Sequence, residues 1–266
     1  MMNSNIASVE RALDILLLLY GEGKEMGVSE IANQLGVYKS TVHRTLATLQ
    51  NKHFVQKNEI TDKYWLGSSL YAIGMMVANT YSLVDIVAPE ADILYMKVKD
   101  IVNVSILHVD SLNGYKSVVI YKARGPLPIL GMNPEIGSSM DAYASSVGKC
   151  MLAFNDIDWP IIKSTGFHAY TEHTITNIDA LKAEMEEVRE KGYAIDNEER
   201  EVGLFCVGAP IFNKEGKAIA AISISGPKAR VFDDRFEEKV LLLKQCAQRI
   251  STLTKEMKTL DESSSI

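Results

Sequence analysis

The chain has 266 residues, of which 47% are hydrophobic and 23% charged, and its formal net charge at pH 7 is −6. This composition excludes a disordered chain and supplies enough apolar side chains for more than one core, so we expect two domains. The three cysteines are widely separated and odd in number, which excludes a disulfide framework and indicates a reducing compartment.

The first predicted element is a helix over residues 9–20, where Leu13, Leu16 and Tyr20 recur at helical spacing. The same apolar run is short, contains Asp14 and lacks both a basic leader and a small-residue cleavage site. We therefore expect no signal peptide, no membrane span and a cytoplasmic location.

Two further helices and a hairpin follow. Ser29 is the expected N-cap of a short helix over residues 30–35, which Gly36 ends, and a third helix is expected over residues 38–52. The segments FVQK and KYWLG are typical of strands, and the polar turn 58–62 separates them. Three helices, a glycine step between the second and the third, and a hairpin form the outline of a winged helix-turn-helix.

The third helix has an unusual charge pattern. Residues 31–58 contain four Lys or Arg and no acidic residue, although the whole chain is acidic. A helical wheel places Val42, Leu46 and Leu49 on the core side, and the opposite side holds Ser40, His43, Arg44, Ala47 and Asn51. Such small, polar and basic side chains suit the major groove of DNA, where Arg pairs with guanine and Ser or Thr bonds phosphate or a base edge. The alternative is a plain solvated helix face.

Several segments closely resemble the IclR family of bacterial transcription regulators: SVERALDILLLL, VSEIANQLGVYKSTVHRTLATLQNKHFV, KYWLG, GYAIDNEEREVGLFCVGAPIF and AISISGP. The resemblance covers nearly the whole chain in the expected order. It implies an α+β fold class, with an N-terminal winged helix-turn-helix domain, a linker helix and a C-terminal GAF-like α/β effector-binding domain. The expected boundaries are 1–66, 67–82 and 83–260, with a disordered tail over 261–266. The resemblance also implies homodimers or homotetramers that act on palindromic operators in double-stranded DNA.

The expected DNA-binding residues are Tyr38, Lys39, Ser40, Thr41, His43, Arg44 and Lys63. Two features depart from the family pattern. Tyr38 stands where the family often has a proline, which would preset the first helical turn. The wing turn carries Glu59 and Asp62, so we expect its contacts with phosphate to be weaker than in the family.

The second half is predicted to combine hairpins with helices. Helices are expected over 67–80, 83–99, 145–154, 178–192 and 233–257, and strands over 102–109, 117–123, 205–212 and 217–225. The Asn-Gly pair at 113–114 predicts a hairpin between the first two strands, and the whole pattern is that of an α+β domain. The loop 123–139 is expected to lie over a ligand pocket, where Leu127, Leu130 and Met132 set ligand size.

The sequence carries no motif of a familiar catalytic centre, because it lacks GxSxG, HExxH, a Walker loop and GxGxxG. His108, His168 and His173 have no metal-ligand spacing. We therefore expect neither enzyme activity nor a metal or cofactor.

A polar set on otherwise apolar strands points to a small-ligand pocket. Ser223 and Ser225 share one face of a strand, Cys206 lies in a second strand and Asp196 ends a third. A helix that starts near Ser146 offers backbone amides that suit a carboxylate. The residues alone leave open that the cysteine is a small buried hydrophobe and that the serines only pack. The family resemblance implies the pocket, with effector-binding residues Ser146, Val147, Asp196, Cys206, Ser223 and Ser225.

The predicted function is a ligand-responsive transcription regulator, more often a repressor, of a metabolic or catabolic operon, with a small carboxylate metabolite as effector. Two alternatives remain open. One is a DNA-binding redox sensor through Cys206, which requires an exposed thiolate of low pKa. The other is a GAF-like cysteine-dependent enzyme, which requires a resolving partner, whereas Cys150 and Cys246 lie on predicted helices with no evident link to Cys206.

Overall fold

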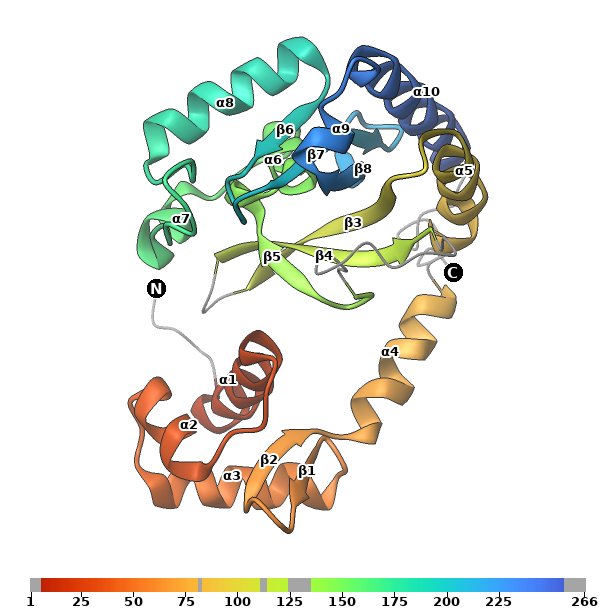
Figure 1. The fold of residues 1–266 in the computed structure, drawn as a ribbon. Helices are drawn as coiled ribbons and strands as arrows, with labels where there is room; N and C mark the ends of the chain where they lie inside the picture. Colours follow the sequence, from red (N-terminus) through yellow and green to blue (C-terminus); the bar gives the residue numbers. More distant parts are fainter. Residues whose placement is uncertain (1–5, 81–82, 111–113, 124–134, 256–266) are drawn as a thin grey trace. The chain divides into compact units, whose positions relative to one another are not determined.

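The structure is a computed structural model that describes residues 6–80, 83–110, 114–123 and 135–255 (Figure 1). The chain divides into two compact units, Met1–Tyr81 and Ser82–Ile266. Each unit has a hydrophobic core of its own. Leu127, Leu130 and Met132 of the expected pocket loop lie outside the described residues, and so does the tail 261–266.

The N-terminal unit is a winged helix-turn-helix, as the sequence predicts. Its elements are α1 (Ala7–Glu22), α2 (Val28–Leu35), α3 (Lys39–Asn51), β1 (Val55–Asn58), β2 (Lys63–Leu66) and α4 (Ser68–Thr80). The two strands pair antiparallel, with Val55 opposite Leu66. The core joins the apolar sides of the three helices to the hairpin, through Ile15, Leu19, Ile31, Val42, Leu46, Leu49, Val55 and Tyr64.

The turn between α2 and α3 depends on a left-handed residue. Gly36 ends α2 with φ 64°, a conformation that glycine adopts without steric strain. The predicted cap of α2 is wrong, because the helix begins one residue before Ser29. Gly27 is the N-cap instead, and its backbone N–H donates to the carboxylate of Glu30 at 2.6 Å.

The last helix of this unit, α4, is unusual in its composition. It has no charged residue along its length, and its side chains from Tyr71 to Ala78 are exposed. Tyr71 and Met76 are each 73% exposed. A helix that is apolar and exposed on every side is typical of a surface that another chain covers.

The C-terminal unit is built on one antiparallel sheet with the strand order β5-β4-β3-β8-β7-β6. The strands are β3 (Ile101–Asp110), β4 (Gly114–Lys122), β5 (Ser139–Asp141), β6 (Ala194–Asn197), β7 (Leu204–Phe212) and β8 (Ala218–Pro227). The helices are α5 (Leu83–Val98), α6 (Ser146–Ala153), α7 (Trp159–Thr165), α8 (Ile178–Lys191), α9 (Lys228–Val231) and α10 (Phe236–Thr254), and a 3-10 turn, Ala142–Ala144, precedes α6. The predicted hairpins β3–β4 and β7–β8 are confirmed, whereas β5, α7 and α9 were not predicted.

The two faces of the sheet have different coverings. One face packs against α5 and α10 through alternate side chains such as Val102, Val207 and Ile222. The opposite face is covered by α6, and α8 packs behind α6 with buried residues such as Leu181 and Met185 (Figure 1). Because side chains alternate along a strand, every second residue of β3, β7 and β8 faces α6.

Candidate nucleic-acid interface and ligand cavity

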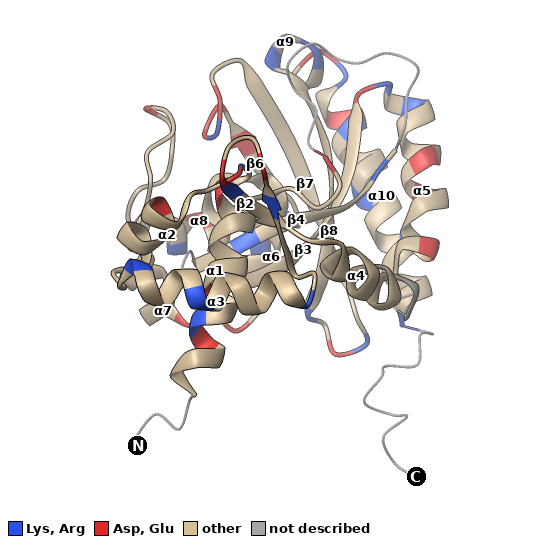
Figure 2. Cartoon of the chain, turned by 90° about the horizontal axis from the view of Figure 1, so that it is seen from below, with Lys and Arg blue, Asp and Glu red and all other residues tan. Residues whose placement is uncertain are grey.

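The two sides of α3 have the faces that the helical wheel predicts. Val42, Leu46 and Leu49 are buried in the core of the winged helix. The exposed residues of the helix are Lys39, Ser40, His43, Arg44, Ala47, Thr48 and Asn51. Lys39 and Arg44 are thus exposed basic residues of this helix. Figure 2 marks lysine and arginine positions blue along the ribbon. The face offers side chains that can bond both phosphate and base edges.

Tyr38 lies immediately before the first turn of this helix. Its backbone is extended, with φ −68° and ψ 139°, and its side chain is 84% exposed. The φ value is one that proline also adopts, so the extended residue before the helix does not require proline. An aromatic ring at this position stands in solvent next to Lys39 and Ser40.

The wing is partly neutralised by acidic neighbours. Lys63 pairs with Glu30 at 3.1 Å, and Lys57 pairs with Asp62. Glu25 accepts hydrogen bonds from the side chains of Asn58 and Thr61. The predicted DNA contact Lys63 thus has an acidic partner inside the unit, and such exposed pairs are weak enough to exchange for phosphate.

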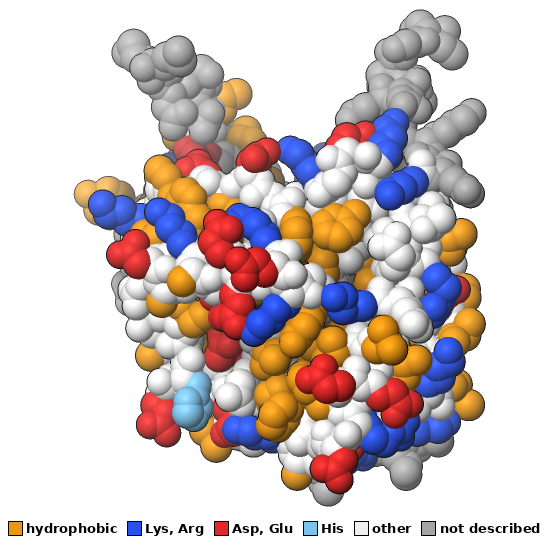
Figure 3. Space-filling view, turned by 90° about the horizontal axis from the view of Figure 1, so that it is seen from above, with side chains coloured by type: hydrophobic (Ala, Val, Ile, Leu, Met, Phe, Trp, Pro, Cys, Tyr) orange, Lys and Arg blue, Asp and Glu red, His pale blue; other side chains and the backbone are white. Residues whose placement is uncertain are grey.

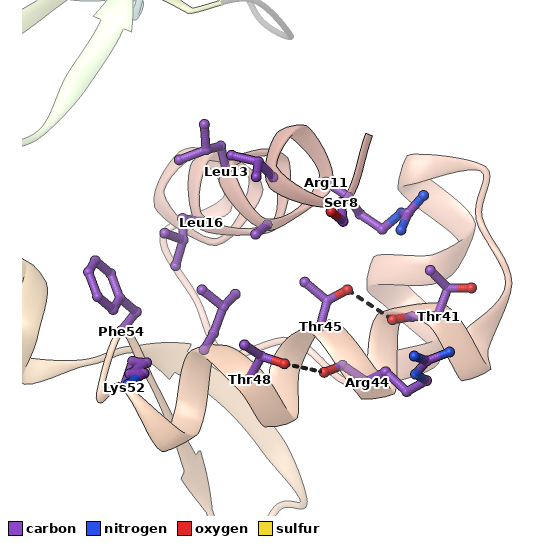
Figure 4. Close-up of a pocket in the computed structure, with 13 residues that line it drawn as sticks. Ser8, Arg11, Leu13, Leu16, Thr41, Arg44, Thr45, Thr48, Lys52 and Phe54 are labelled. Atoms are coloured by element: carbon purple, nitrogen blue, oxygen red, sulfur yellow. Dashed lines mark hydrogen bonds between the residues drawn. The ribbon is translucent and has the colours of Figure 1, made fainter. Parts of the chain in front are cut away.

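A groove of about 620 Å³ separates α1 from α3 (Figure 4). Arg11 and Arg44 lie at one end of it, on different helices, whereas Leu13, Leu16 and Phe54 lie toward the other. Thr45 and Thr48 bond the carbonyls of Thr41 and Arg44 at 3.0 Å, which keeps their hydroxyls on the helix. Two guanidinium groups therefore give one end of this surface a positive charge. On the face shown in Figure 3, by contrast, acidic and basic side chains are interleaved.

The C-terminal unit contains a cavity of about 280 Å³ between the sheet and the start of α6. The pairing register of the strands brings polar residues together on the floor of the cavity, the side that the sheet forms. Asp196 of β6 lies opposite Cys206 of β7, and Cys206 lies opposite Ser225 of β8. The next row pairs Ser223 of β8 with Asn103 of β3. Residues far apart in the sequence thus form two adjacent polar rows on the face that α6 covers.

The helix α6 begins directly over this floor. Its N-cap, Ser145, accepts a hydrogen bond from the backbone N–H of Gly148 at 3.1 Å. Gly208 allows the close approach of β7, because a Cβ at this position would lie 2.9 Å from the carbonyl carbon of Ser146. The first backbone amides of a helix have no partner within it, so those of Ser146 and Val147 are available to an anion.

All six residues of the predicted effector set line this one cavity: Ser146, Val147, Asp196, Cys206, Ser223 and Ser225. Other polar residues that the sequence reasoning missed line it too, among them Asn103, Ser105, Ser138, Ser139 and Arg200. Asn103 and Ser105 carry the same two-residue spacing as Ser223 and Ser225, a signal that the sequence does contain. The structure therefore assembles one concave, polar site that could hold a small ligand.

Comparison with known proteins assigns the chain to a family. A model described as the bacterial transcriptional regulator IclR C-terminal domain matches residues 75–252, and the IclR helix-turn-helix domain matches residues 8–59. The chain belongs to the IclR family of bacterial transcriptional regulators. It is 34% identical, over 93% of its length and 92% of the relative, to the HTH-type transcriptional regulator KdgR of Escherichia coli K12.

Two further relatives support the same family. The chain is 29% identical to the transcriptional repressor IclR of Escherichia coli K12, over 92% of this chain and 89% of that one. The crystal structure of an IclR transcriptional regulator from Alicyclobacillus acidocaldarius matches with a TM-score of 0.76 and 26% identity. That match covers 94% of this chain and 99% of the other.

In this IclR-family chain, the buried lysine Lys149 links α6 to α8 and to the segment after β6. Lys149 of α6 is 1% exposed and bonds Glu184 of α8 at 2.8 Å and Glu199 at 2.5 Å. Burial lowers the pKa of Lys149, but the two carboxylates outweigh burial, so its pKa is raised and it stays charged. The segment after β6, which carries Glu199 and Arg200, is thereby tied to two helices.

Burial also changes the acid–base properties of the cavity floor. It raises the pKa of Asp196 to about 6, although the backbone N–H of Glu199 donates to this carboxyl at 2.8 Å. It raises the pKa of Glu199 to about 7, against the opposing effect of Lys149. A carboxyl group that is partly protonated near neutral pH tolerates a bound anion better than a fully ionised one.

The cysteines do not fit the two alternative functions. Cys206 is buried, and desolvation raises the pKa of its thiol far above the ordinary value. Burial raises the pKa of Cys150 and of Cys246 to about 12. A redox sensor or a cysteine nucleophile needs a thiolate of low pKa, and these surroundings favour the opposite.

Within the described ranges, no group of three or more His, Cys, Asp or Glu side chains is arranged to hold a metal ion. No single helix in the described part of the chain is both long and apolar enough to cross a membrane.

Proposed function

We propose that the protein is a ligand-responsive repressor of a metabolic or catabolic operon, in which a small carboxylate metabolite controls binding to operator DNA. The observation that carries the proposal is the polar cavity beside the start of α6, in a chain whose other unit is a winged helix. The α6 amides favour a small anion, and the raised pKa of Asp196 weakens the charge on the cavity floor that would oppose it.

The α3 helix would enter the major groove. Its exposed Arg44 and Ser40 can reach base edges, while Lys39 and the helix start suit phosphate. Tyr38, Thr41 and His43 complete the surface, with Lys63 exchanging Glu30 for phosphate. Since the face lacks acidic residues, no like charge opposes the DNA backbone.

A second copy of the chain would cover the apolar α4. This uncharged helix exposes Tyr71, Ile73, Met76 and Val77, and its burial would remove that surface from water. A homodimer, or a pair of dimers, would present two copies of α3 to successive major grooves of a palindromic operator.

The effector would act by binding one of two arrangements more tightly. If the metabolite favours the arrangement that does not bind the operator, it lowers the population of the DNA-bound form. Linkage then requires operator DNA to weaken effector binding by the same factor. The protein would act without chemistry of its own, in the cytoplasm, where the operator is found.

The proposal is tested by fluorescence anisotropy with the intergenic DNA upstream of the protein's own gene, over a salt series and against random duplex. We expect the upstream DNA to bind about 10³-fold more tightly than random duplex, or better. Arg44→Ala should weaken specific binding by about 5- to 150-fold and lower the salt slope by about one contact.

Lys24→Ala is the matched control, because this exposed lysine lies between α1 and α2 and pairs with Glu22 rather than facing the groove. It should leave operator affinity unchanged. Equal and weak binding to both duplexes, or equal effects of the two substitutions, would contradict the proposed recognition surface. Light scattering of the same samples gives the number of copies in the complex.

A further inference from the structure

Three polar atoms of residues that line the cavity have no hydrogen-bond partner among the described residues: Asn103 Oδ1, Ser105 Oγ and Arg200 Nη1. All three atoms are buried, and the residues line the same cavity as the predicted effector set. Asn103 is 5% exposed and Ser105 is 1% exposed. Buried polar groups are nearly always paired, so three unpaired atoms around one cavity indicate a ligand that pairs them.

Arg200 is held in place by an aromatic ring rather than by a carboxylate. Its guanidinium carbon lies 3.8 Å from the centre of the Tyr170 ring. The hydroxyl of Tyr170 donates to Asp141, which Lys116 holds at 2.5 Å. Stacking fixes the plane of the guanidinium but leaves its N–H edge free to bond.

Two nearby carboxyl groups, those of Glu199 and Asp196, bond groups other than Arg200. Glu199 is paired with Lys149, and Asp196 accepts the backbone N–H of Glu199. Within the described chain, no carboxylate lies within ion-pair distance of Arg200. Arg200 therefore brings a permanent positive charge to the cavity, where it interacts electrostatically with Asp196 without forming an ion pair.

The two unpaired atoms of Asn103 and Ser105 favour a ligand group other than a carboxylate. Asn103 Oδ1 accepts a hydrogen bond, and Ser105 Oγ can donate or accept one. A hydroxyl group serves both, since it is donor and acceptor at once. Ser223 lies opposite Asn103 in the sheet, and Ser225 is 3.4 Å from Ser223 between their Oγ atoms, so the polar lining continues across β8.

We propose that the effector is a hydroxylated carboxylate of the sugar-acid class, with its carboxylate paired to Arg200 and its hydroxyl groups bonded to Asn103 and Ser105. This inference rests on the proposed function, because it specifies the ligand of the same cavity. A simple keto or fatty acid would satisfy Arg200 and leave Asn103 and Ser105 unpaired. A neutral polyol would do the reverse, and either mismatch lowers affinity.

The test is calorimetric titration of the full-length protein with matched six-carbon probes. The probes are D-gluconate, D-galactonate and D-mannonate, with D-glucitol as the neutral polyol and hexanoate as the acid without hydroxyls. We expect at least one of the three sugar acids to bind, and both comparison compounds to bind at least about 10-fold more weakly than it. The sugar acid that binds should also release operator DNA in the anisotropy assay.

Substitutions then assign the contacts. Arg200→Gln should weaken the sugar acid by about 10- to 100-fold, as expected for loss of a charged hydrogen bond, and leave glucitol binding unchanged. Asn103→Ala should weaken the sugar acid without weakening hexanoate. Arg235→Gln is the control, because the guanidinium of this exposed arginine pairs with Glu238 and the residue does not line the cavity, and it should change neither.

Three results would overturn the inference while leaving the proposed function intact. They are the failure of all three sugar acids to bind, equal binding of hexanoate or glucitol, and full affinity in Arg200→Gln. Release of operator DNA by some other metabolite would then show that the regulator works with a different ligand. If Arg200→Gln does not fold, Arg200→Lys replaces it, since lysine keeps the charge but loses the planar fork and should still weaken binding.

Discussion

Lys149→Met is expected to destabilise the C-terminal unit strongly, because it removes a buried cation and leaves its partners. The Lys149 side chain is 1% exposed and its ammonium group contacts two carboxylates. The side chain of Glu199 is 8% exposed and that of Glu184 is 24% exposed. Methionine has a similar volume, so the loss is electrostatic rather than a cavity. The substitution would leave Glu199 facing Glu184 in a site where water reaches neither well.

The size of the effect follows from this burial. Breaking a buried pair by removing one partner lowers the free energy of unfolding by about 3–5 kcal/mol. For a unit of this size, about 2–4 °C per kcal/mol converts the loss into a fall in Tm of roughly 6–20 °C. The loss should shrink as the pH is lowered through about 7, because burial has raised the pKa of Glu199 and this carboxyl can take a proton.

The assay is urea unfolding followed by far-ultraviolet circular dichroism. Lys163→Met is the control, an exposed lysine of α7 that should change stability by less than about 0.5 kcal/mol. The double variant Lys149→Met with Glu199→Gln should recover part of the loss, since the unpaired charge is gone. A loss below about 1 kcal/mol for Lys149→Met, or none of the pH dependence, would refute the reasoning.

Two further predictions concern Asp196 of the cavity floor and the three buried cysteines. Burial raises the folded-state pKa of Asp196 from 3.8 to about 6, so the folded chain binds more protons than the unfolded one in this window. The free energy of unfolding of the wild type therefore falls as pH rises through this window. Asp196→Asn does not ionise, so by pH ~7 it should gain about 1–3 kcal/mol relative to the wild type compared with pH ~4, as measured by urea unfolding. A difference that stays constant over that range would contradict this prediction. The three thiols should resist an aromatic disulfide reagent in the native protein and all react after unfolding, whereas rapid native labelling of Cys206 would revive the redox alternative.

The winged helix could be predicted closely because its signals are local. Apolar spacing, glycine at the helix end and the acid-free stretch each lie within a few residues of what they specify. The error at α2 has a physical reason: Ser29 and Gly27 can both precede a helix, and Glu30 decides between them by accepting the N–H of Gly27. A side chain three residues ahead thus determined where the helix begins.

The sequence predicts only some of the residues that line the cavity, because strand pairing brings the lining residues together. The spacing of Ser223 and Ser225 shows that they share a face, but not that Asn103 lies across from them in β3. That register depends on where the β3–β4 hairpin turns and on how β3 docks against β8, a contact between segments more than a hundred residues apart. The polar pattern of Asn103 and Ser105 was present, yet strand polarity alone does not distinguish a solvent face from a cavity.

The adjacent residues Glu199 and Arg200 have different surroundings in the structure, although the sequence alone predicts solvent exposure for both. Both follow β6 in an acidic run, where either would be read as solvated surface. The fold turns Glu199 onto Lys149, where it holds the segment to α6 and α8. Arg200 is then left beside the cavity on the ring of Tyr170, with an N–H that no described side chain accepts. A buried charged group with an unsatisfied N–H lowers stability, so its presence beside the cavity is best explained by a negatively charged ligand.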